Sequence, residues 1–99
     1  MVKLNVFSSN RAEEKERYER EFEEFIKEVL KMNTREKMRD FLEGLLTPKE
    51  LREILNRLEI VKMLKRGVSQ HDIAGKLRVG VATVGRGSRE LQKGRLKYV

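Results

Sequence analysis

The sequence predicts an all-α fold built from five helices. Apolar residues recur at intervals of three and four positions, and no stretch alternates apolar and polar residues as a half-buried strand does. Pro48 is the only proline, and it stands where a helix is expected to begin. At 99 residues, the chain is expected to form a single domain whose own core is small.

The first helix is predicted from Asn10 to about Met32, after a flexible arm of residues 1–9. One face is apolar at helical spacing and consists of Tyr18, Phe22, Phe25, Ile26, Val29 and Leu30. The opposite face is almost entirely Glu, Lys and Arg, which is typical of a solvated surface. This face could pack back on its own domain or on a second copy of the chain. Because so short a chain has little core of its own, we favour the second copy. The sequence therefore favours a homodimer.

Two more helices are expected to complete the dimerisation and core region, residues 10–66. Asn33-Thr34 interrupts the first pattern, and the next helix has an apolar face of Met38, Phe41, Leu42 and Leu45. Thr47-Pro48-Lys49-Glu50 then has the sequence of a capping box. Gly67 can end this third helix in the left-handed conformation. Its apolar residues are Leu51, Ile54, Leu55, Leu58, Val61 and Leu64.

Residues 68–93 predict a helix-turn-helix. Ser69 with Asp72 is a capping pair, and Ala74 is the small residue needed where the two helices meet. The residues that have the apolar and small-residue spacing of a helix-turn-helix are Gln70, Ile73, Ala74, Leu77, Val79, Val84 and Leu91. The second helix is expected from about Val81 to Gln92, before a basic tail at residues 94–99. Such a helix can enter the DNA major groove with its N-terminal residues at the base edges.

The distribution of charge supports an interaction with DNA. The whole chain carries +7, but residues 1–61 hold 13 Lys/Arg against 14 Asp/Glu. Residues 62–99 hold 10 Lys/Arg, and their only acidic residues are Asp72 and Glu90. A basic excess on the segment that carries the motif is expected of a phosphate-binding surface. A basic face kept for solubility, or for an anionic membrane, is the alternative.

Other classes of function have less support. The absence of cysteine removes disulfides, thiolate metal sites and cysteine nucleophiles, and it fits a cytoplasmic protein. The only histidine, His71, has no catalytic or metal-binding motif around it, so we expect neither an enzyme nor a metal site. No apolar run has the length of a membrane span, and no signal peptide is expected. A soluble regulator that associates with the nucleoid is favoured.

Two segments carry a more specific combination of residues, LLTPKELREILNRLEIVKMLKRG and VSQHDIAGKLRVGVATVGRGSREL, above all Ala-Thr-Val-x-Arg-Gly-Ser at 82–88. From Leu45 to Leu91, the chain resembles the Trp repressor family of tryptophan-sensing helix-turn-helix repressors. The resemblance implies an intertwined all-helical homodimer that binds operator DNA. The geometry with which the recognition helix would dock on DNA is also implied by this resemblance, and does not follow from the spacing of apolar residues. The family's last helix is missing or shortened here, so the dimer is expected to close differently.

The resemblance also implies a corepressor site. Arg57 and Arg86 match the two arginines that sandwich an indole ring, as planar guanidinium groups can. Glu90 stands where the family has serine, so it could hold the ammonium group of a ligand, or pair with Arg86 and fill the site. L-tryptophan or a related amino acid is the expected corepressor. The remaining positions that match the pocket are Leu45, Leu46, Thr47 and Gly87.

On the DNA side, Gln70, Ala82 and Thr83 match groove-facing positions of the family. The operator sequence of the family cannot be assumed for this chain, because neighbouring positions differ from the family. These positions are His71, Ala74, Gly85 and Gln92. Extra charges at Lys76, Arg78 and Arg89 are expected to contact phosphate. The full set expected to contact DNA is Ser69, Gln70, His71, Ala74, Lys76, Arg78, Val81, Ala82, Thr83, Gly85 and Arg89.

Two alternatives stay open beside a corepressor-dependent repressor. One is a helix-turn-helix protein that binds DNA without a ligand, because its pocket has been lost. The other is a helical protein-interaction module that uses the charged first helix, with the motif as a scaffold only.

Overall fold

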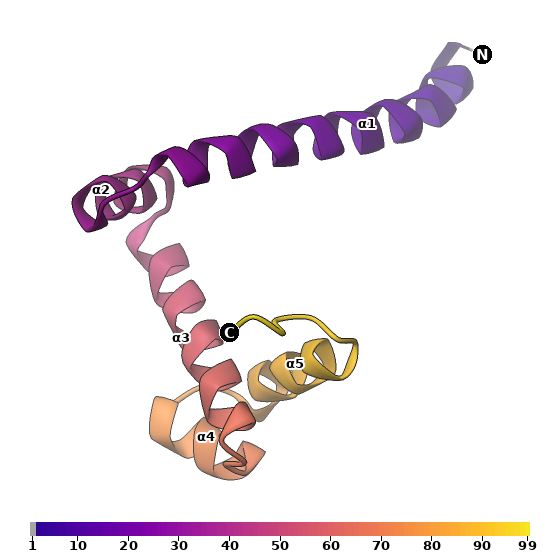
Figure 1. Cartoon of the computed structure of the whole chain (residues 1–99). Helices are drawn as coiled ribbons and strands as arrows, with labels where there is room; N and C mark the ends of the chain where they lie inside the picture. Colours follow the sequence, from indigo (N-terminus) through magenta and orange to yellow (C-terminus); the bar gives the residue numbers. More distant parts are fainter. Residues whose placement is uncertain (1) are drawn as a thin grey trace. The chain divides into compact units, whose positions relative to one another are not determined.

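The computed structural model describes residues 2–99, and the side chains of residues 10–99 (Figure 1). It confirms the all-α fold, with no strand in the part of the chain that is described. The helices are α1 (Val2–Lys31), α2 (Arg35–Leu45), α3 (Pro48–Lys65), α4 (Gln70–Leu77) and α5 (Val81–Gln92). Helix α1 begins at Val2 rather than Asn10, so residues 2–9 are helical instead of forming an arm. Residues 1–9 contain no glycine or proline that would stop a helix there.

The chain divides into two compact units, Met1–Leu42 and Glu43–Val99, where the sequence predicts a single domain. In the first unit, ring contacts join Tyr18 to Phe22 and Phe25 to Phe41, with centroids 5.7 Å and 6.1 Å apart. Nevertheless, none of the side chains described between residues 10 and 42 is fully buried. This unit therefore has no closed core of its own.

The second unit has a closed core where α3, α4 and α5 meet (Figure 1). Ile60, Ile73 and Val84 provide one side chain from each helix, and each is at most 1% exposed. Met63 and Ala74 complete this buried cluster. Half-buried apolar residues surround it: Leu64, Val68, Leu77 and Val79. Burial of this apolar surface holds the two helices of the predicted motif against α3.

The helix ends of this unit follow from local sequence. Thr47 accepts a hydrogen bond from the Glu50 backbone N–H, and the Glu50 carboxylate accepts one from the Thr47 N–H, which completes the predicted capping box. Gly67 has φ +83°, as predicted, and α3 ends in a Schellman arrangement in which the Val68 N–H donates to the Met63 carbonyl. The Ser69 hydroxyl accepts from the Asp72 N–H and starts α4.

Candidate nucleic-acid interface

Helices α4 and α5 form the predicted helix-turn-helix. The turn between them depends on Arg78, which ends α4 in the left-handed conformation with φ 55° and ψ 46°. Its neighbour Val79 is half-buried, and the Val79 N–H donates to the Ala74 carbonyl at 3.1 Å. The turn is thus fixed by a backbone hydrogen bond and an apolar anchor, although an arginine occupies a conformation that normally favours glycine.

Helix α5 buries one face and exposes another. Val84 is fully buried, and Gly87 lies so close to α3 that a Cβ on it would be 3.1 Å from the Ile60 Cγ2 atom. The exposed residues include Val81, Ala82 and Thr83 in the first turn. Because Val84 and Gly87 fix the rotation of the helix, its N-terminal side chains are presented to solvent in a defined orientation.

Most residues predicted to contact DNA are accessible. Those that are exposed are Ser69, Gln70, His71, Lys76, Arg78, Val81, Ala82, Thr83 and Arg89, and Gly85 is half-buried. Ala74, by contrast, is 8% exposed and belongs to the core between the helices. Its small side chain serves the packing role that the motif predicts.

The cations of the α4–α5 segment form no ion pair with a carboxylate in the part of the chain that the structure describes. Among the described residues, no carboxylate lies within 4 Å of Lys76, Arg78, Arg86 or Arg89, whereas other cations of the same unit, such as Arg66, form ion pairs. Helix α5 also has no acidic residue in its first turn, and no side chain caps its N-terminus. Both features leave positive potential uncompensated on this surface, which suits a polyanionic partner.

The residues predicted to bind a corepressor do not form one site within the chain. Thr47 caps the N-terminus of α3, whereas Gly87 packs against Ile60, 13 residues farther along the same helix. Thr47 and Gly87 therefore lie at different ends of the unit. At 1.5 Å per residue, these two ends of α3 are about 20 Å apart. The Thr47 hydroxyl and N–H are both used in the capping box. The close packing against Ile60 accounts for glycine at position 87 without a ligand.

The two arginines differ in their surroundings. Arg57 is exposed on α3 and approaches Glu53, with 3.9 Å between the Arg57 Nη2 and Glu53 Oε2 atoms. Arg86 is exposed on α5 and forms no ion pair with any described residue. Both guanidinium groups therefore keep faces that a planar ring could contact.

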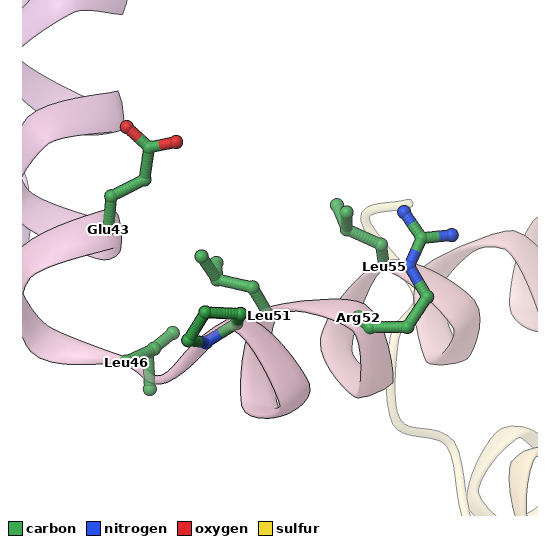
Figure 2. Close-up of a pocket in the computed structure, with 6 residues that line it drawn as sticks. Glu43, Leu46, Leu51, Arg52 and Leu55 are labelled. Atoms are coloured by element: carbon green, nitrogen blue, oxygen red, sulfur yellow. The ribbon is translucent and has the colours of Figure 1, made fainter.

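Leu45 and Leu46 lie at the junction of α2 and α3. Leu45 is exposed, and Leu46 lines a shallow cavity of about 300 Å³ in which Leu51 lies between Glu43 and Arg52 (Figure 2). The complete lining is Glu43, Leu46, Pro48, Leu51, Arg52 and Leu55. Leu46 is the only one of the predicted ligand contacts in this lining, so the cavity is not the predicted corepressor site.

Glu90 pairs with cations that follow it in the chain rather than with Arg86. Its carboxylate lies 3.1 Å from the Lys93 Nζ and 3.5 Å from the Arg95 Nε. The hydrogen bond from Lys93 holds the pKa of Glu90 below its ordinary value, and the charges of Lys93, Arg95 and Arg86 act in the same direction. Glu90 is thus an anion that is already paired within the chain.

Lys65 has a role that the sequence did not predict. Its ammonium group donates to the Leu96 and Val99 carbonyl oxygens, each at 2.6 Å, so the segment after α5 returns to the end of α3 (Figure 1). Gly94, with φ +88°, provides the reversal. Gly94 is a signal for a turn in the sequence. Nothing in the sequence signals the contacts of Lys65 with Leu96 and Val99, which lie 31 and 34 residues away.

In the described part of the chain, no helix is apolar over a long enough stretch to span a membrane. The same residues contain no group of three His, Cys, Asp or Glu side chains placed to hold a metal ion.

Comparison with known proteins gives one consistent result. The model of the family described as "Trp repressor protein" matches residues 20–99. A "Trp operon repressor homolog" of Xylella fastidiosa strain M23 is 32% identical over 80 residues, which cover 80% of this chain and 87% of the relative. A protein of the same description from Vibrio vulnificus strain YJ016 is 39% identical over 69 residues, which cover 68% of each chain. The match extends beyond the helix-turn-helix into α1.

Proposed function

Because the chain belongs to the Trp repressor family, we propose that it represses transcription by inserting α5 into the major groove of an operator. The observation that carries the proposal is the contrast between the two faces of α5. Val84 is locked in the core, while Val81, Ala82 and Thr83 are exposed beside cations that have no acidic partner. Such a protein would act on chromosomal DNA in the cytoplasm.

The exposed residues divide into two roles. Gln70, Ala82 and Thr83 lie in the first turns of α4 and α5, where side chains can reach base edges. Lys76 and Arg78 lie farther along α4 and in the turn, where they would contact phosphate. Base contacts give preference for one sequence, whereas phosphate contacts give affinity for any duplex and a dependence on salt.

A homodimer is the second part of the proposal. Tyr18, Phe22 and Phe25 on α1 are exposed, and α3 exposes Ile54, Leu55 and Leu58. Apolar surface of this extent is typically covered by a partner. Two copies would also present two α5 helices to successive major grooves, about 34 Å apart. Phe22→Glu should convert a dimer into a monomer in analytical ultracentrifugation, whereas Glu19→Gln on the same helix should not. A monomeric wild-type protein would contradict the dimer.

The corepressor is the third part. A ligand that touches both Thr47 and Gly87 would have to bridge about 20 Å along α3, which is longer than an amino acid. L-tryptophan would therefore bind between Arg57 and Arg86 of one copy and the Leu45–Thr47 segment of the other. Titration calorimetry with L-tryptophan should give heat that Arg57→Ala and Arg86→Ala each abolish. Absence of heat and of thermal stabilisation at millimolar ligand would favour a repressor that works without one.

The experiment that tests the central proposal is selection of bound fragments from random duplexes, with and without L-tryptophan. Recovery of one sequence with two related half-sites is expected. Thr83→Ala and Gln70→Ala should then lose the preference for that sequence, whereas Lys76→Gln should weaken the binding of all duplexes and reduce the salt dependence. Failure to bind any duplex at low salt would favour the protein-interaction module instead.

A further inference from the structure

The core holds α5 near the middle of the helix and leaves its last turn without a buried anchor. Val84 is fully buried, and Gly87 lies against Ile60 of α3. None of residues 88–92 is fully buried. Packing therefore fixes the helix around Val84 and Gly87, and any further hold on its end has to come from other contacts.

A short segment, residues 93–99, follows this last turn and is called the strap below. Its beginning is tied to α5, because the Glu90 carboxylate lies 3.1 Å from the Lys93 Nζ and 3.5 Å from the Arg95 Nε. The Arg95 N–H also donates to the Glu90 carbonyl oxygen at 3.1 Å. Gly94, with φ +88°, allows the chain to reverse there. A movement of the end of α5 would therefore carry the strap with it.

Lys65 ties the other end of the strap to α3. Its ammonium group donates to the Leu96 and Val99 carbonyl oxygens, each at 2.6 Å. The Val99 N–H donates to the same Leu96 carbonyl at 3.3 Å, which closes a turn. Leu96 has φ 61°, a conformation that leucine keeps only where its surroundings hold it. These bonds use two of the three N–H donors of Lys65, so at most one is left for another partner.

We propose that Lys65 is a positioning residue for DNA reading. By holding the strap, it ties the end of α5 to the end of α3 and fixes the direction in which the first turn of α5 points. This inference rests on the proposed function and adds to it a residue that lies outside the helix-turn-helix.

The geometry of a pivoting helix explains why a contact at one end affects the other. Val81 lies three residues before Val84, or about 4.5 Å along the axis, and Gln92 lies eight residues after it, or about 12 Å. If the end of α5 swung by about 3 Å around Val84, the first turn would move by about 1 Å in the opposite direction. Contacts that read a base require placement within about 0.5 Å. Release of the strap should therefore reduce base reading.

Lys62 provides a matched control for Lys65. It lies three residues earlier on α3, is also exposed and carries the same charge. Its side chain forms no hydrogen bond or ion pair with the residues that the structure describes. Lys62→Met and Lys65→Met thus remove the same charge, and only Lys65→Met releases the strap. If net charge were the whole effect, the two variants would weaken DNA binding alike.

The binding test measures fluorescence anisotropy with a duplex recovered by selection and with a shuffled duplex, over a series of salt concentrations. Lys65→Met should lower the ratio of the two affinities at least about fivefold, because displaced side chains lose base contacts. The slope of log affinity against log salt should change by much less than the value of about 0.9 expected for one lost phosphate contact. Lys62→Met should leave the ratio unchanged. Lys65→Arg should keep most of it, since a guanidinium group can also donate to two carbonyl oxygens.

A second measurement follows the strap without DNA. The heteronuclear Overhauser effects of the amides of residues 96–99 should be as high as those of α5 in the wild-type protein and should fall in Lys65→Met. Gly94→Val should have the same effect, because a β-branched residue does not readily adopt φ +88°, although the space around it is open. The double variant should lose little more of the duplex preference than either single variant, because both changes release one strap. Circular dichroism melting checks that each variant is folded at the temperature of the binding test.

Several results would overturn the positioning role. Equal Overhauser effects in wild-type protein and Lys65→Met would do so, as would an equal loss of preference for Lys62→Met and Lys65→Met. A fall of about 0.9 in the salt slope of Lys65→Met would instead indicate a phosphate contact. Thr83→Ala separates this failure from failure of the proposed function. If it abolishes the preference between duplexes while Lys65→Met keeps it, the repressor stands and only the positioning role falls. If wild-type protein binds neither duplex, both fall.

Discussion

The two compact units of the chain use their apolar residues in opposite ways. In residues 43–99, α3, α4 and α5 bring Ile60, Ile73 and Val84 into almost complete burial. In residues 10–42, comparable side chains remain accessible, with Tyr18 60% and Leu30 75% exposed. The helix-turn-helix can therefore hold its shape from contacts within one copy, whereas the apolar face of α1 stays exposed in one copy.

The comparison also separates two sources of helix stability. Helix α1 carries ion pairs at helical spacing, such as Arg17–Glu21 at 2.9 Å and Lys31–Glu28 at 2.9 Å. Exposed pairs of this kind contribute little to stability, because water and salt screen them. Burial of one large aliphatic side chain in the other unit contributes several times more. The helix-turn-helix is thus held by packing, and α1 by local interactions.

The largest predicted effect tests this contrast directly. Ile73→Ala should lower the free energy of unfolding by about 2–5 kcal/mol, because it leaves a cavity at the centre of the core. Leu30→Ala, which removes a similar side chain from α1, should cost less than about 1 kcal/mol. Urea unfolding followed by circular dichroism measures both. Equal costs would show that Leu30 is packed in solution.

Two glycines on α5 should respond to alanine with opposite signs. In Gly87→Ala, the Cβ would lie 3.1 Å from the Ile60 Cγ2, and this overpacking should destabilise the protein by about 1 kcal/mol after the gain in helix propensity. In Gly85→Ala, contacts at 3.5 Å and 3.6 Å are ordinary, so the propensity gain should stabilise by about 0.5 kcal/mol. Melting temperatures of the two variants give the comparison. A stabilising Gly87→Ala would contradict the close approach of α5 to α3.

The turn of the motif predicts a smaller gain. Arg78→Gly should stabilise the folded protein by roughly 0.5 kcal/mol, because relief of left-handed strain exceeds the extra entropy of glycine in the unfolded chain. The same change should weaken DNA binding, since it removes a charge that no carboxylate offsets. Melting and anisotropy measurements on one preparation check both. Gly75→Ala, in the middle of α4, is a control for helix propensity alone. Loss of stability in Arg78→Gly would indicate that the arginine side chain makes a stabilising contact.

Local sequence predicted the elements of the second unit well. The capping box at Thr47, the left-handed Gly67, the cap at Ser69 and the small residue at Ala74 were all visible, because each depends on neighbours within five positions. The start of α1 was predicted too late. Asn10 is a residue type that often caps a helix, but here the helix runs through it without a break. Ala74 was predicted for both the core and the duplex, and its burial fits the core.

The candidate site was predictable only where it is local. The exposed residues of α4 and α5 follow from the helical period once Ile73 and Val84 are assigned to the core. By contrast, Lys65 holds Leu96 across 31 positions, and nothing in the period of either segment signals this pairing. Each residue predicted to bind a corepressor was matched singly to a family position. The distance along α3 between Thr47 and the residues that contact Gly87 becomes visible only in three dimensions. In the proposed homodimer, a second copy would bring them together.

The smallest predicted effect concerns the start of α3. Hydrogen bonds from the Thr47 backbone N–H and hydroxyl hold the pKa of Glu50 below its ordinary value. A carboxyl group whose pKa is lower in the folded protein stabilises it above the unfolded value of about 4.3, and this stabilisation is lost as the pH falls through the folded value. Glu50→Gln should therefore lower the melting temperature at pH 7 and make little difference at pH 3. Glu53→Gln, on the same helix but outside the capping box, is the control. If Glu50→Gln lowered the melting temperature equally at both pH values, the charge of Glu50 would contribute nothing to the cap beyond what a neutral amide provides.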